Sequence, residues 1–320
     1  MAPRFMKAIA FVAVGVLASV VACGPPEAAP PTGTEGGAPV ETDGNFTRRI
    51  YERNFVFASL DGDSLFIVPW MMQIVESPDT VRRDAHAWLA RGGVWEAFYT
   101  ERWWTRPTRA PGQVLPHGRM RLLVDDGDAI DGILFDDGVR RLDLILGEVE
   151  ASWTDPRGGS FEVLRGAAYL ADQRVEGMIL DMARASAGDA PPGGDWAFLL
   201  SGDSAHFVFA ADTEYGGETE PIYRGWASLG DDALQWAEVR VDWSRTEAFP
   251  PARRDIPVAW RVWTADGLLE AQFEAISAEI RPGQGPGPLL PVRALYEVEG
   301  NVSTAEGTFP VRGILVHERR

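Results

Sequence analysis

Apolar and polar residues alternate with a period of two along much of the chain, which is the pattern of half-buried β-strands. A clear example is the stretch 235–243, where Val239, Val241 and Trp243 alternate with charged residues. Pairs of Asp and Gly, typical of tight hairpin turns, interrupt the apolar runs at 61–62, 126–127, 131–132, 137–138, 202–203 and 266–267. The pattern predicts an all-β protein made of antiparallel hairpins.

One stretch, 77–91, carries a helix signal instead. It opens with a capping serine followed by proline and ends before Gly92, a common C-terminal cap. Its apolar residues would share one face of a helix: Val81, Ala85, Trp88 and Leu89. We therefore expect a helix here and little helix elsewhere.

Landmarks recur in the same order in the two halves of the chain, which indicates an internal duplication. The matched pairs are 60–68 with 200–208, 137–138 with 266–267, Glu150 with Glu279, Arg165 with Arg293, Tyr169 with Tyr296, and 175–180 with 311–316. One large β-sandwich with chemically similar hairpins remains the alternative. Two β-rich halves fit two closed antiparallel barrels, because closure removes unpaired strand edges. The Pro/Gly-rich stretch 186–195 marks the boundary, so the barrels are predicted over 46–190 and 191–320.

The N-terminus has the three-part pattern of a secretory signal peptide over residues 1–22. A basic start is followed by an apolar run of about 14 residues, which is too short to cross a bilayer as a helix. Residues 20–23, Val-Val-Ala-Cys, resemble a bacterial lipobox, so lipidation of Cys23 is expected. An ordinary signal peptide with an incidental cysteine is the alternative. Residues 23–45 are rich in Pro, Gly and Thr and are predicted to form a disordered tether.

These features predict a protein anchored by its N-terminal lipid in the bacterial cell envelope. Gly24, rather than Asp, follows the cysteine, which favours the outer membrane facing the periplasm. The net charge of −17 argues against binding to nucleic acid, which is itself polyanionic. With its one cysteine lipidated, the chain would have no thiol left for a disulfide, a metal site or a nucleophile.

The second half contains Ile-Pro-Val-Ala-Trp at 256–260, the 266–267 turn, Tyr-Glu-Val-Glu-Gly at 296–300 and a Gly-led final strand at 313–318. In these residues it is similar to the duplicated lipocalin-like proteins grouped with AttH and bacterial carotenoid hydratases. The resemblance implies the double-barrel fold and an apolar ligand. Glu297 stands where the family usually has tryptophan, and the His-x-Trp and Tyr-x-Asp pairs of the hydratases are absent.

Aromatic residues are the most prominent feature of the composition, with 12 tryptophans and 15 phenylalanines. Large aromatics line apolar cavities, although they also fill barrel cores. The candidate ligand contacts are Trp103, Trp104, Trp236, Trp243, Trp260 and Tyr296. Because neighbouring residues of a strand point to opposite faces, one of Trp103 and Trp104 should face inward.

His206 is the candidate general acid or base, because its repeat counterpart is Phe66. It would act with Asp203 or Glu238; a partly buried, hydrogen-bonded structural histidine is the alternative. The histidines show no metal-ligand spacing, and the acidic stretch 125–132 fails the spacing of a calcium loop. No metal or cofactor is therefore expected.

Three hypotheses follow. The first is an envelope lipoprotein that binds or carries a hydrophobic small molecule. The second is a cofactor-free hydratase, cyclase or isomerase on the same fold, and the third is a structural lipoprotein. Polar groups that converge inside a barrel would favour the enzyme, and a wholly apolar cavity would favour the carrier.

Overall fold

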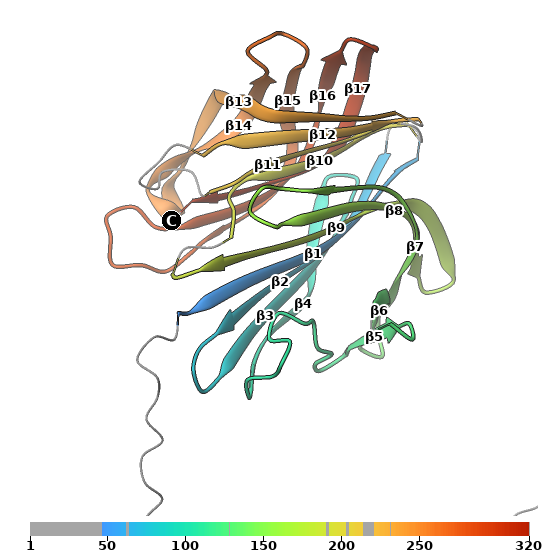
Figure 1. Cartoon of the computed structure of the whole chain (residues 1–320), viewed down its shortest axis with the longest axis vertical. Coiled ribbons are helices and arrows are strands. Elements are labelled where there is room, and N and C mark those ends of the chain that lie inside the picture. Colours follow the sequence, from blue (N-terminus) through green and yellow to red (C-terminus); the bar gives the residue numbers. More distant parts are fainter. Residues whose placement is uncertain are drawn as a thin grey trace, which may run out of the picture. The chain divides into compact units, whose positions relative to one another are not determined.

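The computed structural model describes residues 47–61, 64–127, 129–189, 192–202, 205–213, 221–230 and 232–319 (Figure 1). The predicted signal peptide, Cys23 and the tether up to residue 45 lie outside the described residues. Nearly all regular structure is β-strand, and the described helical structure is one 3₁₀ turn, Pro250–Ala252. In this part of the chain no helix has the length and apolarity needed to cross a membrane.

The first half forms a curled, nine-stranded antiparallel sheet (Figure 1). Its strand order is β4-β3-β2-β1-β9-β8-β7-β6-β5, so each strand pairs with its neighbour in sequence and β1 also pairs with β9. The strands are β1 (Arg49–Asp61), β2 (Ser64–Glu76), β3 (Val81–Arg91), β4 (Val94–Thr105), β5 (Met120–Val124), β6 (Ile130–Asp136), β7 (Arg141–Thr154), β8 (Ser160–Leu170) and β9 (Gln173–Ala187).

The second half forms a closed, eight-stranded barrel in which every strand pairs with its sequence neighbours and β10 pairs with β17. Its strands are β10 (Trp196–Ser201), β11 (Ala205–Ala211), β12 (Tyr223–Leu229), β13 (Asp232–Phe249), β14 (Arg254–Trp263), β15 (Glu270–Pro282), β16 (Val292–Thr304) and β17 (Gly307–Arg319). The sequence prediction of an all-β, lipocalin-like duplicated fold is confirmed.

The repeat landmarks occupy equivalent strands of the two halves. The stretches 60–68 and 200–208 each form the first hairpin, β1–β2 and β10–β11. The stretches 175–180 and 311–316 lie in the last strands, β9 and β17, which each pair back with the first strand of their own half. The duplication is therefore one of topology as well as of local sequence.

The expected helix over 77–91 is wrong, because these residues form a turn and strand β3. The Ser77 amide donates to the Thr80 carbonyl oxygen at 2.9 Å, which closes a tight turn between β2 and β3. β3 is buried on both faces: Ala85 and Ala87 face one apolar core, and Trp88 and Ala90 face another. Apolar residues on both faces of a strand imitate helical spacing, and pairing with β2 and β4 decided the conformation.

The two halves differ at one junction. In the barrel, β13 pairs with β14 and closes the cylinder. In the sheet, β4 and β5 together stand in the place of the long strand β13; within the described residues no backbone ladder joins β4 to β5, and the connection 106–119 lies against the inner face of the sheet instead. Arg83, which is almost fully buried, donates to the carbonyl oxygens of Pro111 (3.1 Å) and Gln113 (2.5 Å). The Tyr99 hydroxyl donates to the His117 carbonyl oxygen at 2.9 Å.

The described residues belong to one compact unit, Asn45–Arg320, and their buried apolar side chains form three cores. One core fills the barrel around Phe207, Trp260 and Tyr296. A second lies on the inner face of the curled sheet around Trp70 and Phe135. The third joins sheet and barrel and includes Trp88, Trp153, Phe161, Trp196 and Trp226.

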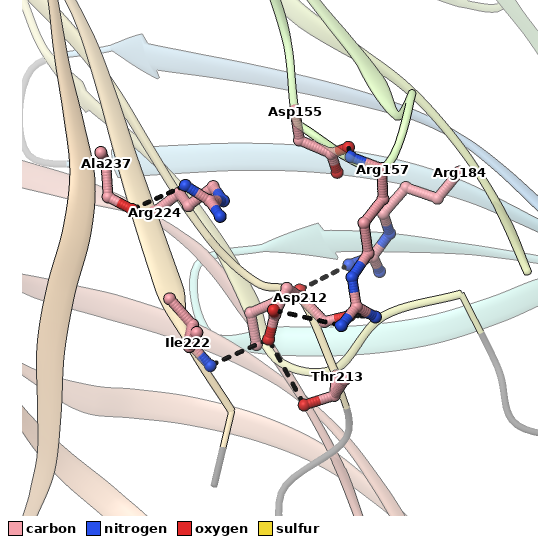
Figure 2. A network of polar contacts seen from close by, with 9 residues as sticks. Asp155, Arg157, Arg184, Asp212, Thr213, Ile222, Arg224 and Ala237 are labelled. Carbon is pink, nitrogen blue, oxygen red and sulfur yellow. Dashed lines mark hydrogen bonds and ion pairs between the residues drawn. The ribbon is translucent and has the colours of Figure 1, made fainter. Parts of the chain in front are cut away.

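A polar clasp also joins sheet and barrel beside the third core (Figure 2). Arg157, in the β7–β8 turn, donates to the Asp212 carbonyl oxygen at 3.0 Å and pairs with its carboxylate at 3.4 Å. Arg184 of β9 donates to the Ala211 carbonyl oxygen at 3.3 Å. Gly193 leaves room for Arg184, because a Cβ at that position would meet the guanidinium at 1.9 Å.

Candidate active site

A buried acidic group lies on the inner face of the curled sheet, on strand β9. Asp181 stands opposite Phe55 of β1 and Glu162 of β8 in the two ladders of β9. The same face of β9 carries Ile179, a residue of the inner-face core. The alternation of the strand therefore turns Asp181 toward the inside of the curl, where it is only 5% exposed.

The neighbouring charge is a single arginine. Arg53 Nη2 lies 2.5 Å from Asp181 Oδ2, and the Arg53 guanidinium also stacks over the Phe55 ring at 5.1 Å. Asp181 Oδ1 and Arg53 Nε are buried and have no protein hydrogen-bond partner. The pair thus leaves one carboxylate oxygen and one N–H without a protein partner.

Burial raises the pKa of Asp181 from 3.8 to about 7. Arg53 lowers this pKa through its charge and hydrogen bond, and the Glu162 carboxylate raises it again. Desolvation of the carboxylate outweighs the arginine because Asp181 lies against apolar neighbours on the inner face. At neutral pH the carboxyl group therefore exists in both protonation states, as a general acid or base requires.

Asp181 lies on the floor of a cavity of about 390 Å³. The floor also includes the buried Val114 and Leu164, while Gln113 and Val149 lie exposed at the rim. The remaining lining comes from four strands and two loops: Arg53, Gly112, Ala129, Ile130, Asp131, Leu146, Gly147 and Glu162. Polar and apolar groups share this lining about equally, and the size of the cavity suits a small organic molecule.

One wall of the cavity is the 106–119 segment, which replaces a β4–β5 ladder. Gly112 packs on the Tyr51 ring so closely that a Cβ would approach it to 2.7 Å. His117 stacks on Trp103, with ring centroids 4.5 Å apart and planes at 5°. Arg83 does not line the cavity, but its hydrogen bond to the Gln113 carbonyl oxygen fixes the 106–119 segment that forms this wall.

The proposed catalytic residues of the second half do not meet in this cavity. His206 is buried on the outer side of the barrel wall, since its neighbour Phe207 points into the barrel core. Glu238 is exposed on β13, next to Val239, which pairs with Tyr223 at the start of β12. His206 of β11 pairs with Ser228, near the other end of β12. Asp203 lies outside the described residues. The structure therefore does not bring His206 and Glu238 together.

The predicted aromatic ligand contacts separate into three groups. Trp103 is buried on the inner face of the sheet, and Trp104 is 61% exposed, as expected for neighbours on a strand. Trp236 is partly buried against the barrel core. Trp260 and Tyr296 lie in the barrel core with their ring centroids 5.2 Å apart, and the partly buried Trp243 packs against this core with its ring 5.2 Å from that of His317.

A second buried polar pair closes the barrel next to these aromatics. His317 Nδ1 lies 2.9 Å from Asp195 Oδ2, and Asp195 Oδ1 accepts the Glu318 amide at 3.0 Å. The cavity beside Asp195 and Trp260 measures only about 20 Å³, since aromatic side chains fill the barrel. These hydrogen bonds connect the segment just before β10 to the end of β17. The cavity beside the pair is too small for an organic ligand.

A larger groove of about 1100 Å³ runs over the outer surface of the barrel. Its charged residues form surface ion pairs, Arg245 with Glu274 and Arg312 with Glu299. It lacks the buried ionisable group of the Asp181 cavity, so we take the smaller cavity as the candidate site. Among the described residues, no group of three or more His, Cys, Asp or Glu is arranged to hold a metal ion.

Neither Asp181 nor Arg53 was predicted as a site residue from the sequence. A usable signal was present, because Asp181 interrupts the apolar run 178–182, Met-Ile-Leu-Asp-Met. A charge inside an apolar strand points to burial beside a partner. The partner could not be read from the sequence, since Arg53 is far away along the chain and reaches Asp181 through β1–β9 pairing.

Solved structures with a similar fold exist, and their sequence identity to this chain is low. An AttH protein from Nitrosomonas europaea matches with a TM-score of 0.57 and 12% identity, over 91% of this chain and 100% of that one. CghA matches with a TM-score of 0.51 and 11% identity, over 85% and 88%. The chain has the AttH-like fold. The resemblance found in the sequence is thereby confirmed for the fold.

Kievitone hydratase from Nectria haematococca matches with a TM-score of 0.49 and 10% identity, over 84% of this chain and 88% of that one. No protein-family model matches the chain, and a search of curated proteins finds no match. The proposal for function therefore rests on the geometry of the site.

Proposed function

We propose that the protein is a cofactor-free acid–base enzyme that acts on a small, largely apolar molecule in the Asp181 cavity. The observation that carries the proposal is a buried carboxyl group that lines a cavity of about 390 Å³ and has one oxygen without a protein partner. The raised pKa of Asp181, about 7, suits it to give and take a proton near neutral pH.

The reaction class that fits is hydration, dehydration or isomerisation of a carbon–carbon double bond. Protonated Asp181 would give its proton to one alkene carbon, and the second carbon would become cationic. Arg53 would stabilise the carboxylate that this step leaves behind. Water that adds to the cation would return a proton to Asp181, so the net change is addition of one water. Loss of a proton from a neighbouring carbon instead would give an isomer.

Glu162 has a supporting role in this scheme. Its negative charge raises the pKa of Asp181 and so favours the protonated acid before the reaction. The apolar wall formed by Val114, Leu146 and Leu164 would exclude bulk water from the cation. The side chains around the cavity thus divide into a proton donor, its counter-ion and an apolar wall.

A carrier of a hydrophobic small molecule is the second candidate. The observation that favours it is exposed apolar side chains at the rim: Val149, which lines the cavity, is 51% exposed, and Val124, opposite the lining residue Ile130 in the β5–β6 ladder, is 54% exposed. An apolar rim gives an apolar molecule a path from a membrane into a protein. On this reading Asp181 and Arg53 would orient a polar end of the ligand and transfer no proton.

Either role fits a position at the cell envelope, which we propose from the sequence around Cys23. Lipidation at Cys23 would hold the cavity beside the membrane from which an apolar molecule partitions. Labelling of cells with radioactive palmitate should mark the wild-type chain and leave Cys23→Ser unlabelled. Equal labelling of both chains would contradict the lipid anchor.

The test of the enzyme proposal is solvent-isotope incorporation. Polyene and terpenoid extracts are incubated in D₂O with the wild-type protein, Asp181→Asn, or the rim variant Asp131→Asn as a matched control. We expect deuterated or hydrated products with the wild type and Asp131→Asn, and a loss of about 100-fold or more in rate with Asp181→Asn. Stoichiometric binding without any mass change would support the carrier. If neither binding nor exchange is observed, both functions are contradicted.

A further inference from the structure

A second cavity, of about 290 Å³, lies between the curled sheet and the barrel and is rich in arginine. Sheet strands β3 and β4 contribute Arg82 and Arg102, and barrel strands β15–β17 contribute Arg281, Arg293 and Arg319. The carboxylates that line it are Glu52, Asp84 and Glu318. We call it the arginine cleft. It carries an excess of positive charge on a chain whose net charge is −17.

Two of the lining arginines share a single carboxylate. Asp84 is shared by Arg82, at 2.9 Å, and Arg102. Glu318 pairs with Arg293 at 2.6 Å. Two lining residues pair with residues outside the lining: Arg281 with Glu279 at 2.7 Å, and Glu52 with Arg184 at 2.8 Å. These two outside partners carry one negative and one positive charge, so together they leave the net charge around the cleft unchanged. The Arg102 side chain is 59% exposed and that of Arg281 is 43% exposed, which leaves both guanidinium groups open to a ligand.

His86 lines the arginine cleft, and its pKa responds to the charges of the arginines around it. Its ring stacks on Trp88 at 5.7 Å, and its Nδ1 is buried without a hydrogen-bond partner. The pKa of His86 is lowered to about 4, mainly by burial and in part by the charges of Arg293, Arg281 and Arg102. Asp84 is the opposing charge. A neutral imidazole in the cleft can offer an N–H to an anion.

We propose that the arginine cleft binds the oxyanion group of a small organic molecule, either a carboxylate or a phosphate. Guanidinium groups bind such oxyanions through paired, charge-assisted hydrogen bonds. The cleft is larger than a bare phosphate, and Met71, Pro282 and Val292 give it apolar lining for the organic part. Arg102 from the sheet and Arg281 from the barrel are the expected principal contacts.

This site is separate from the Asp181 cavity. Glu52 and Arg53 are neighbours on β1 and point to opposite faces of the sheet, Glu52 into the cleft and Arg53 into the cavity. Asp181→Asn should therefore leave anion binding unchanged, and failure of one proposal does not imply failure of the other.

The test is an NMR titration of the histidine ring signals, which are few because the chain has four histidines. Inorganic phosphate, acetate and glycerol 3-phosphate are added at constant ionic strength with chloride as the reference. An anion in the cleft places negative charge beside His86, so we expect its pKa to rise. The His86→Gln variant assigns the signal.

The decisive comparison uses two double variants with the same change in charge. Arg102→Gln with Arg281→Gln alters the cleft, and Arg174→Gln with Arg261→Gln alters exposed ion pairs elsewhere. We expect affinity for phosphate or acetate to fall about tenfold or more in the first variant only. No response of His86 to any of the anions, or equal weakening in both variants, would overturn the proposal.

A final arm separates a soluble ligand from a lipid headgroup. Vesicles that contain phosphatidylglycerol are tested for co-flotation with the same two double variants. Flotation that depends on Arg102 and Arg281 would assign the oxyanion to a lipid, and binding of glycerol 3-phosphate without flotation would assign it to a soluble molecule. Circular dichroism confirms that each variant is folded.

Discussion

Arg53 Nη2 lies 2.5 Å from Asp181 Oδ2, yet the pKa of Asp181 is raised to about 7. An arginine at this distance normally lowers the pKa of a carboxyl group. Here burial has the larger effect, because Asp181 is 5% exposed on the inner face of the curled sheet. The protein therefore holds an acid that is uncharged for part of the time beside a permanent cation.

The first prediction concerns the pH dependence of stability. The folded state keeps a proton on Asp181 between pH 4 and 7, where the unfolded chain has lost it, so the free energy of unfolding falls as pH rises through this window. About 3 pKa units correspond to about 4 kcal/mol. We expect Asp181→Asn to remove this fall, as measured by urea unfolding at pH 4.5 and 8.

Asp131→Asn is the control for this measurement, because Asp131 lies at the exposed rim of the same cavity. Its stability should follow the wild-type curve. A wild-type curve that rises through the window, or an Asp181→Asn curve that keeps the wild-type slope, would show that Asp181 is ionised in the folded protein at pH 5.

The second prediction concerns the cavity wall at 106–119. Arg83→Met keeps an unbranched side chain but removes the donors to the Pro111 and Gln113 carbonyl oxygens. We expect the variant to lose about 2 to 4 kcal/mol of stability and to be cut by trypsin after Arg109 and Arg119 well before the wild type. Arg82→Met, whose side chain is partly exposed, should show wild-type proteolysis in this segment.

The third prediction uses the tryptophan pair on β4. Trp103 is buried and stacked on His117, whereas Trp104 is 61% exposed. Trp103→Ala should cost about 3 kcal/mol or more, and Trp104→Ala should change stability by less than about 1 kcal/mol. Thermal unfolding of the two variants measures the difference. Equal losses would mean that β4 does not present these neighbours to opposite environments.

The fourth prediction concerns closure of the barrel. Asp195→Ala removes the partner of His317 Nδ1 and of the Glu318 amide, both near the end of β17. We expect a loss of about 2 to 4 kcal/mol, because the buried His317 ring and the partly buried Glu318 amide are left without these partners. Glu299→Ala, which breaks a surface pair with Arg312, should cost less than about 1 kcal/mol. Hydrogen exchange should rise first along β10 and β17.

Local patterns predicted the strands and the duplication well. The alternation over 235–243 lies within β13, and the 137–138 and 266–267 turns join consecutive strands of each half. These features depend on neighbours a few residues apart, so they can be read directly from the chain. The same local reasoning gave a wrong helix over 77–91, because burial of β3 on both faces comes from distant strands.

The candidate site shows the same division. An all-β, duplicated chain, its aromatic cores and a charged residue inside the apolar run of β9 can be read from local sequence patterns. The meeting of this residue, Asp181, with Arg53 and Glu162 beneath the 106–119 segment follows from the folded chain alone, because their approach depends on strand register and on the absence of a β4–β5 ladder among the described residues. The pKa of a carboxyl group follows from the burial and charges around it, and those are set by residues far apart in the chain.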